Sequence, residues 1–406
     1  MFQYARGPRI SGKPTNHALN RIQNKKADKP PEKYLLSKGH LEDCLQKIRS
    51  TAGKAPGPDG VRLDSFSESQ WEKKLKFLAQ SINKGTYQPG PTKPVILQKD
   101  CGGTRTIQVP NLIDRVASRA CLEVFSPILE KRFVDWSYGY RPGRSHLHVF
   151  AHISKAYEEG CVYLAHFDVR KAFDHVNIRK LSKLIREMDV MDKAKWLGQS
   201  IVSKGLLDDG EADGVDGLGI SQGDSASGLL FNLYMHEFHD KVLDGCVGEG
   251  LQVYRYADDL VVIGKDELAV NQLMKQSVGL LQEVGLECVC EDTVNLQAGS
   301  IDVLGLTISG HGNNIEFNLT ETCWSRLERS LDEGLNQDFP TCLNKQVVKA
   351  WRQAVNPVTW TGRYQERLVN LLSSFGVTLH EDEEYEPKQD WSQVRNTLLG
   401  SLDLRV

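Results

Sequence analysis

The sequence of 406 residues lacks any long apolar run. No stretch approaches the roughly 18 apolar residues that cross a bilayer, and the opening residues, MFQYARGPRI, contain no apolar signal-peptide core. Internal repeats of about 20 to 50 residues are also missing, which excludes a solenoid or a propeller. We therefore expect a cytoplasmic protein with no membrane partner, and a chain of this length allows two or three packed units.

Cysteine pairs are missing as well. The nine cysteines are an odd number, they contain no CxxC pair, and only Cys288 and Cys290 lie close together. A cytoplasmic chain keeps such thiols reduced, and structural zinc needs two well-spaced ligand pairs. We therefore expect neither a disulfide framework nor a zinc site.

A large excess of one charge is the third absence, because 50 Lys and Arg residues face 53 Asp and Glu residues. The charges are nevertheless unevenly distributed. Residues 1–33 carry eight basic and two acidic side chains, residues 84–150 carry ten and five, and residues 381–386 are mostly acidic. This pattern indicates a basic flexible arm and a local positive surface that suits a phosphate backbone, with an ordinary solvated face as the alternative.

The periodicity of apolar residues indicates a mixture of helices and strands. Helices are expected at residues 34–50, 71–82 and 112–132, and through most of 315–376. Strands are expected at residues 95–99 and 105–109 as a hairpin, at 162–169, at 251–263 as strand, turn and strand, and at 303–309. The fold class is therefore predicted to be α+β.

Asp258 and Asp259 lie side by side between the apolar runs LQVYRY and LVVIG. Ordinary exposed turns account for most such pairs, but apolar flanks call for a compensating charge. A hairpin tip would let both carboxylates share a divalent metal, and Asp168, at the end of the apolar strand VYLAHFDV, could join them. Three such ligands suit two Mg²⁺ ions, which favour in-line displacement at phosphorus. The pattern predicts chemistry that makes or breaks phosphodiesters.

These carboxylates belong to a series of motifs that occur together and in a fixed order. The motifs are APGPDGV at 55–61, QKDCGGTRTIQVPNLIDRVASRA at 98–120, SYGYRPGRS at 137–145, HFDVRKAFDHV at 166–176, GISQGDSASGLLFNLYMHEF at 219–238, YRYADDLVVI at 254–263, and GL at 285–286 with VLGLTI at 303–308. The set covers about residues 50–310 and resembles bacterial reverse transcriptases of the group II intron lineage, of a stand-alone type.

The resemblance implies roles for single residues. Asp168, Asp258 and Asp259 would be the catalytic metal ligands, and Phe173 would clash with a 2′-hydroxyl and so favour deoxynucleotides, with a core phenylalanine as the alternative. The other implied contacts are with the incoming nucleotide (Lys99, Arg105, Gln222 and Gly223), the primer end (Tyr256) and the template (Arg141 and Arg144). Solvated surface cations are the alternative for Lys99 and Arg105, and structural salt bridges are the alternative for Arg141 and Arg144.

The sequence also departs from the family pattern. Ser221 stands where the family has proline before the QG step, and Gly228 stands where it has proline after serine. Acidic residues at 291 and 292 replace a lysine proposed to protonate pyrophosphate, which leaves the general acid unassigned. His148 and His152 would share a helix face, but no Cys or carboxylate joins them at ligand spacing, so we expect a structural pair.

Together these observations predict a right-hand polymerase. Its parts are a basic flexible arm (1–33), fingers (34–160), a palm of antiparallel sheet and helices (161–312), a helical thumb (313–376) and an acidic C-terminal extension (377–406). The predicted function is RNA-directed DNA synthesis from dNTPs on an RNA template. The expected template is a dedicated small non-coding RNA, and the expected role is anti-phage defence. The alternatives are a catalytically silent RNA-binding scaffold and a template-independent or protein-primed DNA polymerase.

Overall fold

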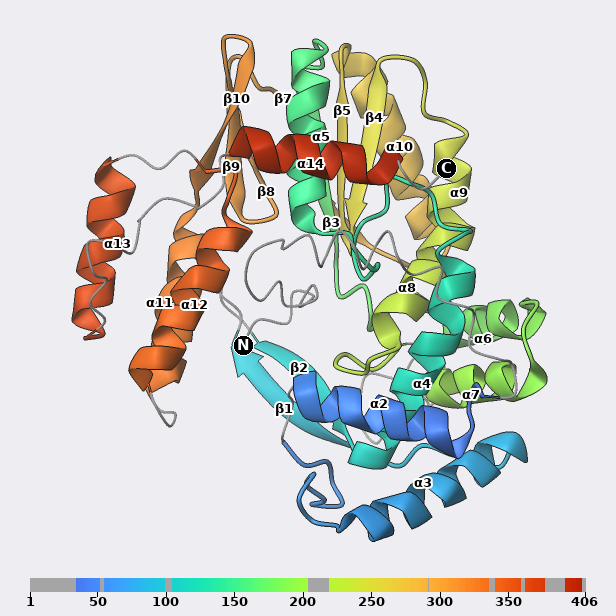
Figure 1. Cartoon of the computed structure of the whole chain (residues 1–406). Coiled ribbons are helices and arrows are strands. Elements are labelled where there is room, and N and C mark those ends of the chain that lie inside the picture. The colour runs from blue at the N-terminus through green and yellow to red at the C-terminus, as the bar shows by residue number, and fades with distance from the viewer. Residues whose placement is uncertain are drawn as a thin grey trace.

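The computed structural model describes residues 34–51, 55–98, 104–203, 219–290, 292–335, 340–358, 362–376 and 391–403. The predictions for the basic arm, for Lys99 and for the acidic stretch 377–390 lie outside these residues. The side chain of Arg105 also lies outside them, although its backbone is described. The arrangement of the described elements is shown in Figure 1.

The first elements combine three helices with a hairpin, at the bottom of Figure 1. They are α2 (Lys38–Thr51), α3 (Glu68–Asn83), β1 (Thr92–Gln98), β2 (Thr104–Pro110) and α4 (Leu112–Leu129). Helix α3 begins at a capping box formed by Ser67 and Gln70, and its buried residues recur at steps of three and four. Strands β1 and β2 pair antiparallel throughout, which confirms the predicted hairpin.

A five-stranded antiparallel sheet forms the centre of the molecule. Its strands are β3 (Tyr163–Val169), β4 (Leu251–Tyr256), β5 (Asp259–Gly264), β6 (Cys288–Cys290) and β7 (Val294–Asn295). The order is β4-β5-β3-β6, and β7 also pairs with β3. The α+β class predicted from the sequence is therefore confirmed.

Both faces of this sheet are buried, because alternate residues of each strand enter different cores. Leu260 and Val262 of β5 belong to a core shared with the first elements and with the helices that follow β3. Val261 and Ile263 belong to a second core, which includes α5 (His146–Glu158). Burial on both faces explains why the strands read as nearly continuous apolar runs.

The first core is completed by helices from the middle of the chain. These are α6 (Ile178–Glu187), α7 (Asp192–Ser203), α8 (Ser227–Met235), the π-helical turn η2 (His236–Asp240), α9 (Lys241–Asp244) and α10 (Glu267–Gln282). Every residue of α8 is buried, and α10 packs against β3 and β5.

The last elements are a small sheet and four helices. They are β8 (Ser300–Val303), β9 (Leu306–His311), β10 (Asn314–Leu319), α11 (Glu321–Leu335), α12 (Pro340–Ala354), α13 (Gly362–Ser374) and α14 (Trp391–Asp403). Trp324 of α11 and Trp351 of α12 lie in the second core together with Val261 and Ile263 of the central sheet. The helices predicted as the thumb, at the left of Figure 1, are therefore rooted in the central sheet by apolar packing.

One predicted strand is wrong. The sequence favoured a single strand over residues 303–309, but Leu304 and Gly305 form the turn between β8 and β9. Both residues have positive φ, 49° for Leu304 and 87° for Gly305, so the chain reverses there. A leucine in this conformation is uncommon, which explains why the turn was not recognised.

Helix α14 was not predicted, because it lies in a region characterised only by its acidic composition. It packs against α5, and Arg395 forms a bidentate ion pair with Glu158, with an Nη1–Oε1 distance of 2.6 Å. Trp391 lies edge-on to Phe317 of β10, with ring centroids 6.2 Å apart. Among the described helices, none combines the length and apolarity that a bilayer crossing requires.

Candidate active site

Three carboxylates from two distant segments meet at one end of the central sheet. Asp168 is the penultimate residue of β3, and its direct antiparallel partner is Asp259, the first residue of β5. Asp258 immediately precedes Asp259 in the turn after β4. One carboxylate oxygen from each residue lies within 4.8 Å of the other two, and Asp168 is exposed while the other two are half-buried. The structure thus brings together the three acidic residues that the sequence singled out.

A two-residue turn makes this convergence possible. Tyr256 and Asp259 are paired residues of β4 and β5, so only Ala257 and Asp258 connect the strands. Ala257 has a φ of 60°, the left-handed conformation that such hairpin turns need. The carbonyl of Asp258 accepts a hydrogen bond from the N–H of Val169 at 3.2 Å, which ties the turn to β3. The hairpin tip expected from the sequence is confirmed.

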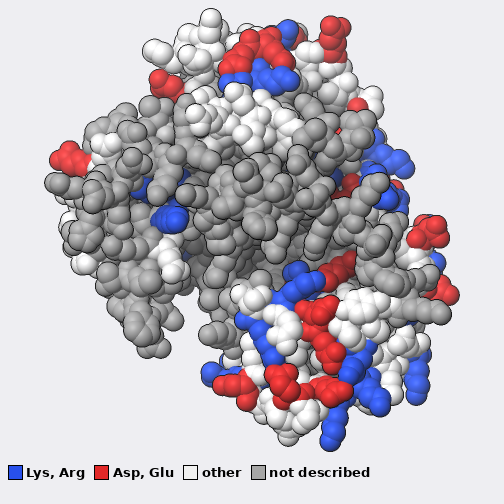
Figure 2. All heavy atoms as spheres, viewed as in Figure 1, with Lys and Arg blue, Asp and Glu red and all other residues white. Residues whose placement is uncertain are grey.

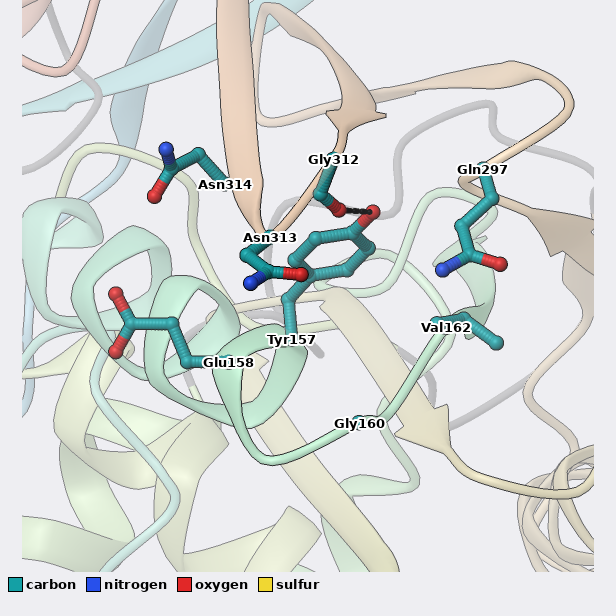
Figure 3. Close-up of a pocket in the computed structure, with 8 residues that line it drawn as sticks. All are labelled: Tyr157, Glu158, Gly160, Val162, Gln297, Gly312, Asn313 and Asn314. Atoms are coloured by element: carbon teal, nitrogen blue, oxygen red, sulfur yellow. Dashed lines mark hydrogen bonds between the residues drawn. The ribbon is translucent and has the colours of Figure 1, made fainter.

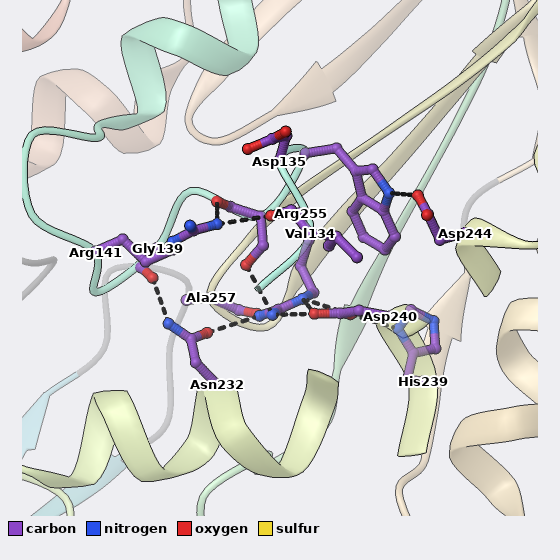
Figure 4. A network of polar contacts seen from close by, with 12 residues as sticks. Val134, Asp135, Gly139, Arg141, Asn232, His239, Asp240, Asp244, Arg255 and Ala257 are labelled. Carbon is purple, nitrogen blue, oxygen red and sulfur yellow. Dashed lines mark hydrogen bonds and ion pairs between the residues drawn. The ribbon is translucent and has the colours of Figure 1, made fainter. Parts of the chain in front are cut away.

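A buried arginine supports the turn from below (Figure 4). Arg255 is fully buried, and its Nη1 donates to the carbonyl of Ala257 at 2.7 Å and to Oδ1 of Asn232 at 3.0 Å. Its Nη2 donates to the hydroxyl of Ser137 at 2.8 Å, and its Nε donates to Asp240 at 2.9 Å. One guanidinium therefore joins the hairpin turn to three other residues, Ser137, Asn232 and Asp240, and its five N–H donors are well matched to this task.

Asp240 neutralises this arginine and extends the network. Burial alone would raise the pKa of Asp240, but the guanidinium of Arg255 and the ring of His239 outweigh it and lower the pKa to about 2. His239 lies 2.8 Å from Asp240 through Nδ1 and 2.7 Å from the Ser277 hydroxyl of α10 through Nε2. The π-helical turn brings His239 and Asp240 into these positions, and such turns are frequent at functional sites.

A histidine contacts the carboxylate group directly. His166 lies two residues before Asp168 on the same face of β3, and its Nε2 is 3.0 Å from Oδ1 of Asp259. A carboxylate accepts hydrogen bonds, so we assign the imidazole proton to Nε2. This contact restrains one oxygen of Asp259 and leaves the other available to a ligand.

The donor set is chemically suited to a divalent metal. Three carboxylates without a thiolate are the ligands of hard cations such as Mg²⁺ or Mn²⁺. Their exposure leaves room for water or phosphate oxygens as further ligands. Asp168, Asp258 and Asp259 are therefore the residues that could hold such ions.

A second cluster of metal-ligating types, formed by His40, Cys44 and Glu123, does not meet the same requirements. Nδ1 of His40 accepts a backbone N–H at 3.1 Å, so the ring proton is on Nε2, which points at Glu123. Lys47 and Arg119 each donate to Glu123 at 2.7 Å, and burial raises the pKa of the Cys44 thiol to about 12. The thiol and Nε2 are protonated and the carboxylate is neutralised by two cations, so these three groups contribute to packing and are not suited to binding a metal.

Phe173 is held between two aromatic rings. It stacks on Phe231 of α8 with centroids 4.9 Å apart, and Tyr140 meets it edge-on at 5.8 Å. Gly228 explains one departure from the family pattern, since a Cβ there would lie 2.5 Å from the Tyr140 ring. A proline at 228 would displace Tyr140 and with it the support of Phe173. The role of Phe173 in excluding a 2′-hydroxyl stays a prediction.

The QG step lies against the hairpin of β1 and β2. The carbonyl of Gln222 accepts the N–H of Gln108 in β2 at 3.0 Å, and its side chain donates to Asp174 at 3.0 Å. Gly223 has a φ of 109°, and a Cβ there would lie 2.8 Å from Ile107. Glycine is thus required both by conformation and by close approach. Nucleotide contact by these residues stays a prediction.

The two arginines predicted to bind the template have internal partners. Nη1 of Arg141 donates to the carbonyls of Val134 and Ser137 at 2.7 and 2.8 Å, and its Nε is 3.1 Å from Glu130. Burial lowers the pKa of Arg141 to about 10. Arg144 pairs with Asp135 at 3.1 Å and is also buried. These contacts favour the structural salt bridges that the sequence left open as the alternative, and template binding by either residue stays a prediction.

Many other cations of the predicted fingers are paired as well. Lys38 with Glu72 and Arg49 with Glu68 form surface ion pairs at 2.6 and 2.8 Å. Figure 2 accordingly shows basic and acidic side chains interspersed over the lower lobe. The positive surface expected from the counts at residues 84–150 is reduced by such pairing. Arg119, Arg141 and Arg144 have acidic partners within this stretch, and Arg132 pairs with Glu237.

Tyr256 is buried and faces away from water. Burial raises its pKa to about 12, and its ring lies edge-on to His146 with centroids 6.0 Å apart. Contact with a primer end stays a prediction. For the nucleotide clamp, Arg105 pairs with Leu97 through the backbone of the hairpin, and its role and that of Lys99 also stay predictions.

A shallow hollow of about 430 Å³ lies at the other end of β3 (Figure 3). Asn313, Asn314 and Gln297 line it with amide groups, and the hydroxyl of Tyr157 donates to the carbonyl of Gly312 at 3.1 Å. The hollow adjoins Val162, whereas Asp168 ends the same strand, so the two sites are separate.

Sequence reasoning missed His166, Arg255 and Asp240. A signal was present for Arg255, because a charged residue inside the apolar strand LQVYRY needs a buried partner. Asp240 and His166 gave no local signal, since their contacts are with residues 15 and 93 positions away.

Comparisons with known proteins agree with this geometry. A family model described as "Reverse transcriptase (RNA-dependent DNA polymerase)" matches residues 93–308. The chain is 29% identical over 269 residues to Protein YkfC of Escherichia coli (strain K12), covering 58% of this chain and 70% of that protein. It is 28% identical over 239 residues to the group II intron-encoded protein LtrA of Lactococcus lactis subsp. cremoris, covering 57% and 39%. A putative COX1/OXI3 intron 2 protein of Saccharomyces cerevisiae is 27% identical over 206 residues, covering 50% and 23%. The chain thus spans well under half the length of the last two relatives.

Proposed function

This chain belongs to the reverse transcriptase family, and on that premise we propose that it copies an RNA template into DNA with two Mg²⁺ ions held by Asp168, Asp258 and Asp259. The observation that carries the proposal is the convergence of the three carboxylates within 4.8 Å. Two divalent ions at such a site stabilise the attacking hydroxyl and the leaving pyrophosphate during in-line displacement at phosphorus. The residues of this chain fix the carboxylates, through Arg255 below the turn and His166 beside Asp259.

For the incoming dNTP we propose a pocket bounded by Phe173, Gln222 and Gly223. Phe173 stacks on Phe231 and packs against the edge-on ring of Tyr140. These contacts support the proposal that the Phe173 ring is held rigidly enough to reject a 2′-hydroxyl. The backbone hydrogen bond from Gln108 of β2 to Gln222 joins the hairpin of β1 and β2 to this pocket. Lys99 and Arg105, which follow β1 and belong to β2 in the sequence, would therefore contact the triphosphate of the same nucleotide. Arginine suits this role because its guanidinium binds phosphate through two parallel hydrogen bonds.

We further propose that the template is a dedicated small non-coding RNA and that the DNA product acts in anti-phage defence in the cytoplasm. The motivation is the resemblance to stand-alone bacterial reverse transcriptases. Sequencing the RNA that copurifies with the protein tests the first point, since a single enriched species is expected and a sample of total cellular RNA would refute it. Plating phage on cells with the wild-type or the Asp258→Ala gene tests the second, and equal plaque counts would refute it.

Primer extension tests the polymerase itself. With an RNA template, a DNA primer, dNTPs and Mg²⁺, we expect full-length DNA from the wild type and none from the Asp258→Ala/Asp259→Ala variant. The matched control is Asp302→Ala, an acidic residue of β8 outside the carboxylate group. Product from the double variant would refute the assignment of the site.

The same assay separates the two alternative functions. A wild type that binds RNA but extends no primer would support a silent scaffold. DNA made without template, or DNA attached covalently to the protein, would support template-independent or protein-primed synthesis. The intact set of three carboxylates favours catalysis over the scaffold.

A further inference from the structure

His146 links two parts of the molecule that are far apart in sequence. It is the first residue of α5, and its Nε2 lies 2.8 Å from the carbonyl oxygen of Ala354, 208 positions further along the chain. Ala354 is the last residue of α12. A carbonyl only accepts hydrogen bonds, so Nε2 of His146 carries the proton and donates it.

The end of α12 needs this donor. The last carbonyls of a helix have no partner within the helix. Pro357, three residues after Ala354, has no N–H, and the N–H of Val358 is used by the carbonyl of Val355. A histidine side chain near the end of a helix can supply the missing hydrogen bond. His146 therefore caps α12 from another part of the fold.

The same imidazole also touches the strand that leads to the catalytic turn. Its ring is edge-on to Tyr256, at 6.0 Å and 82°, and Tyr256 is the last residue of β4, two positions before Asp258. Phe150 also packs perpendicular to the ring, at 5.9 Å and 90°. Burial lowers the pKa of His146, so the ring is neutral and keeps one fixed donor at physiological pH.

Apolar packing alone does not fix the direction of α12. Trp351, Val355 and Val358 anchor its end in the second core, and contacts of this kind are not directional. The hydrogen bond from His146 is directional, and it joins the end of α12 to a side chain that also contacts Tyr256 at the end of β4. His146 thus links α12 to the strand that leads to the carboxylates.

We propose that His146 is a positioning residue that holds the thumb helix α12 in register with the catalytic turn, and so sets how long primer and template stay bound between nucleotide additions. This inference rests on the proposed polymerase function and on the prediction that residues 313–376 form its thumb. It concerns the number of nucleotides added per binding event, and the rate of a single addition is set by the carboxylates.

Two substitutions separate the contacts of His146. His146→Phe keeps a ring against Tyr256 but removes the donor to Ala354, whereas His146→Gln keeps an N–H donor of similar reach. His152→Gln is the matched control, because His152 lies on the same helix and contacts Tyr254 of the same strand at 5.5 Å. Thermal melting of all variants checks that each is folded.

The measurement is product length after a single binding event, with excess unlabelled duplex as a trap, together with the rate of one nucleotide addition. For His146→Phe we expect products shorter by about fivefold, the factor that corresponds to one neutral hydrogen bond, with a single-addition rate within about twofold of the wild type. His146→Gln and His152→Gln should keep the wild-type product length.

Each outcome decides the inference. Unchanged product length in a folded His146→Phe variant would overturn it, and so would a single-addition rate that falls in the same proportion as the length. If His146→Phe does not fold, His146→Gln decides instead. Because it keeps a donor to Ala354, shortened products from folded His146→Gln would overturn the inference, whereas wild-type length would support it. A wild type that extends no primer would refute the proposed function, which distinguishes that failure from failure of the inference.

Discussion

Arg255 and Asp240 form an ion pair that is shielded from solvent on all sides. A buried pair of this kind adds little net stability compared with apolar residues, but the loss of one partner leaves the other as an uncompensated charge. In this protein the remaining charge would lie directly beneath the turn that carries Asp258. The stability of the molecule and the geometry of the candidate site are therefore linked at these two residues.

Asp240→Asn tests this link. We expect the free energy of unfolding to fall by about 3 to 5 kcal/mol, because Arg255 loses its counter-ion while staying buried. Urea denaturation followed by circular dichroism measures the change. Glu321→Gln is the matched control, since it breaks the exposed ion pair with Arg367 and should leave the midpoint nearly unchanged. Equal shifts in both variants would contradict the account.

Phe173→Val tests the sugar gate. In the proposed role, the ring would occupy the space that a 2′-hydroxyl needs. We therefore expect the preference for dCTP over CTP, measured as a ratio of kcat/KM values, to fall by about 10- to 100-fold. Phe317→Val, which removes a buried ring from the second core, should lower stability but keep the preference. A preference that survives in Phe173→Val would show that another group selects the sugar.

The hairpin of β4 and β5 depends on a close backbone contact with the loop before α5. An added Cβ at Gly139 would lie 2.2 Å from the backbone nitrogen of Ala257, and the carbonyl of Gly139 accepts a hydrogen bond from Asn232 at 2.7 Å. The backbone of this loop is thus in close contact with the turn that positions Asp258. Only a residue without a side chain allows this approach.

Gly139→Ala should displace the turn. We expect kcat for nucleotide addition to fall by about 10²-fold, since a displacement of about 1 Å at a catalytic group has that effect. Gly279→Ala in α10, where an added Cβ meets nothing within 4 Å, should keep full activity. Steady-state kinetics on the same primer and template measures both, and wild-type kcat in Gly139→Ala would contradict the proposed role of the contact.

The sequence predicts elements well where their signals are local. The hairpins of β1 with β2 and of β4 with β5 follow from apolar runs separated by short polar steps, and α3 follows from its apolar periodicity. The turn at Leu304 and α14 were missed, because an uncommon backbone conformation and a contact with a distant helix leave no periodic pattern. The carboxylates were found through their unusual apolar flanks, whereas His166 and Asp240 act through partners on other elements.

On the scale of the whole molecule, the central sheet separates two cores. One core joins the sheet to the elements predicted as fingers, and the other joins it to α5 and the elements predicted as thumb. Asp168 and Asp259 lie on the face of the second core, at the end of the sheet where His146 also lies. The candidate site thus lies at the end of the sheet where α5 contacts β4 through His146 and Tyr256.

The free energy of unfolding should also depend on pH in the acidic range. The pKa of Asp240 in the folded protein is about 2, below the 3.8 of a free aspartate, so its stabilisation is complete above about pH 4 and is lost as pH falls toward 2. We expect the free energy of unfolding to fall by about 2 kcal/mol over this window because of Asp240. Urea titrations between pH 2 and 5 measure the slope, and Asp240→Asn should flatten it. Identical slopes in the two proteins would contradict the assignment.

The central claim is that Asp168, Asp258 and Asp259 together bind metal ions. Replacement of Mg²⁺ by Fe²⁺ in the presence of dNTP, primer and template, followed by ascorbate and peroxide, cleaves the backbone beside the bound ion. The account predicts fragments that end near residue 168 and near residues 258–259, both lost in Asp168→Asn. Cleavage at other segments, or the same two cuts in Asp168→Asn, would contradict it.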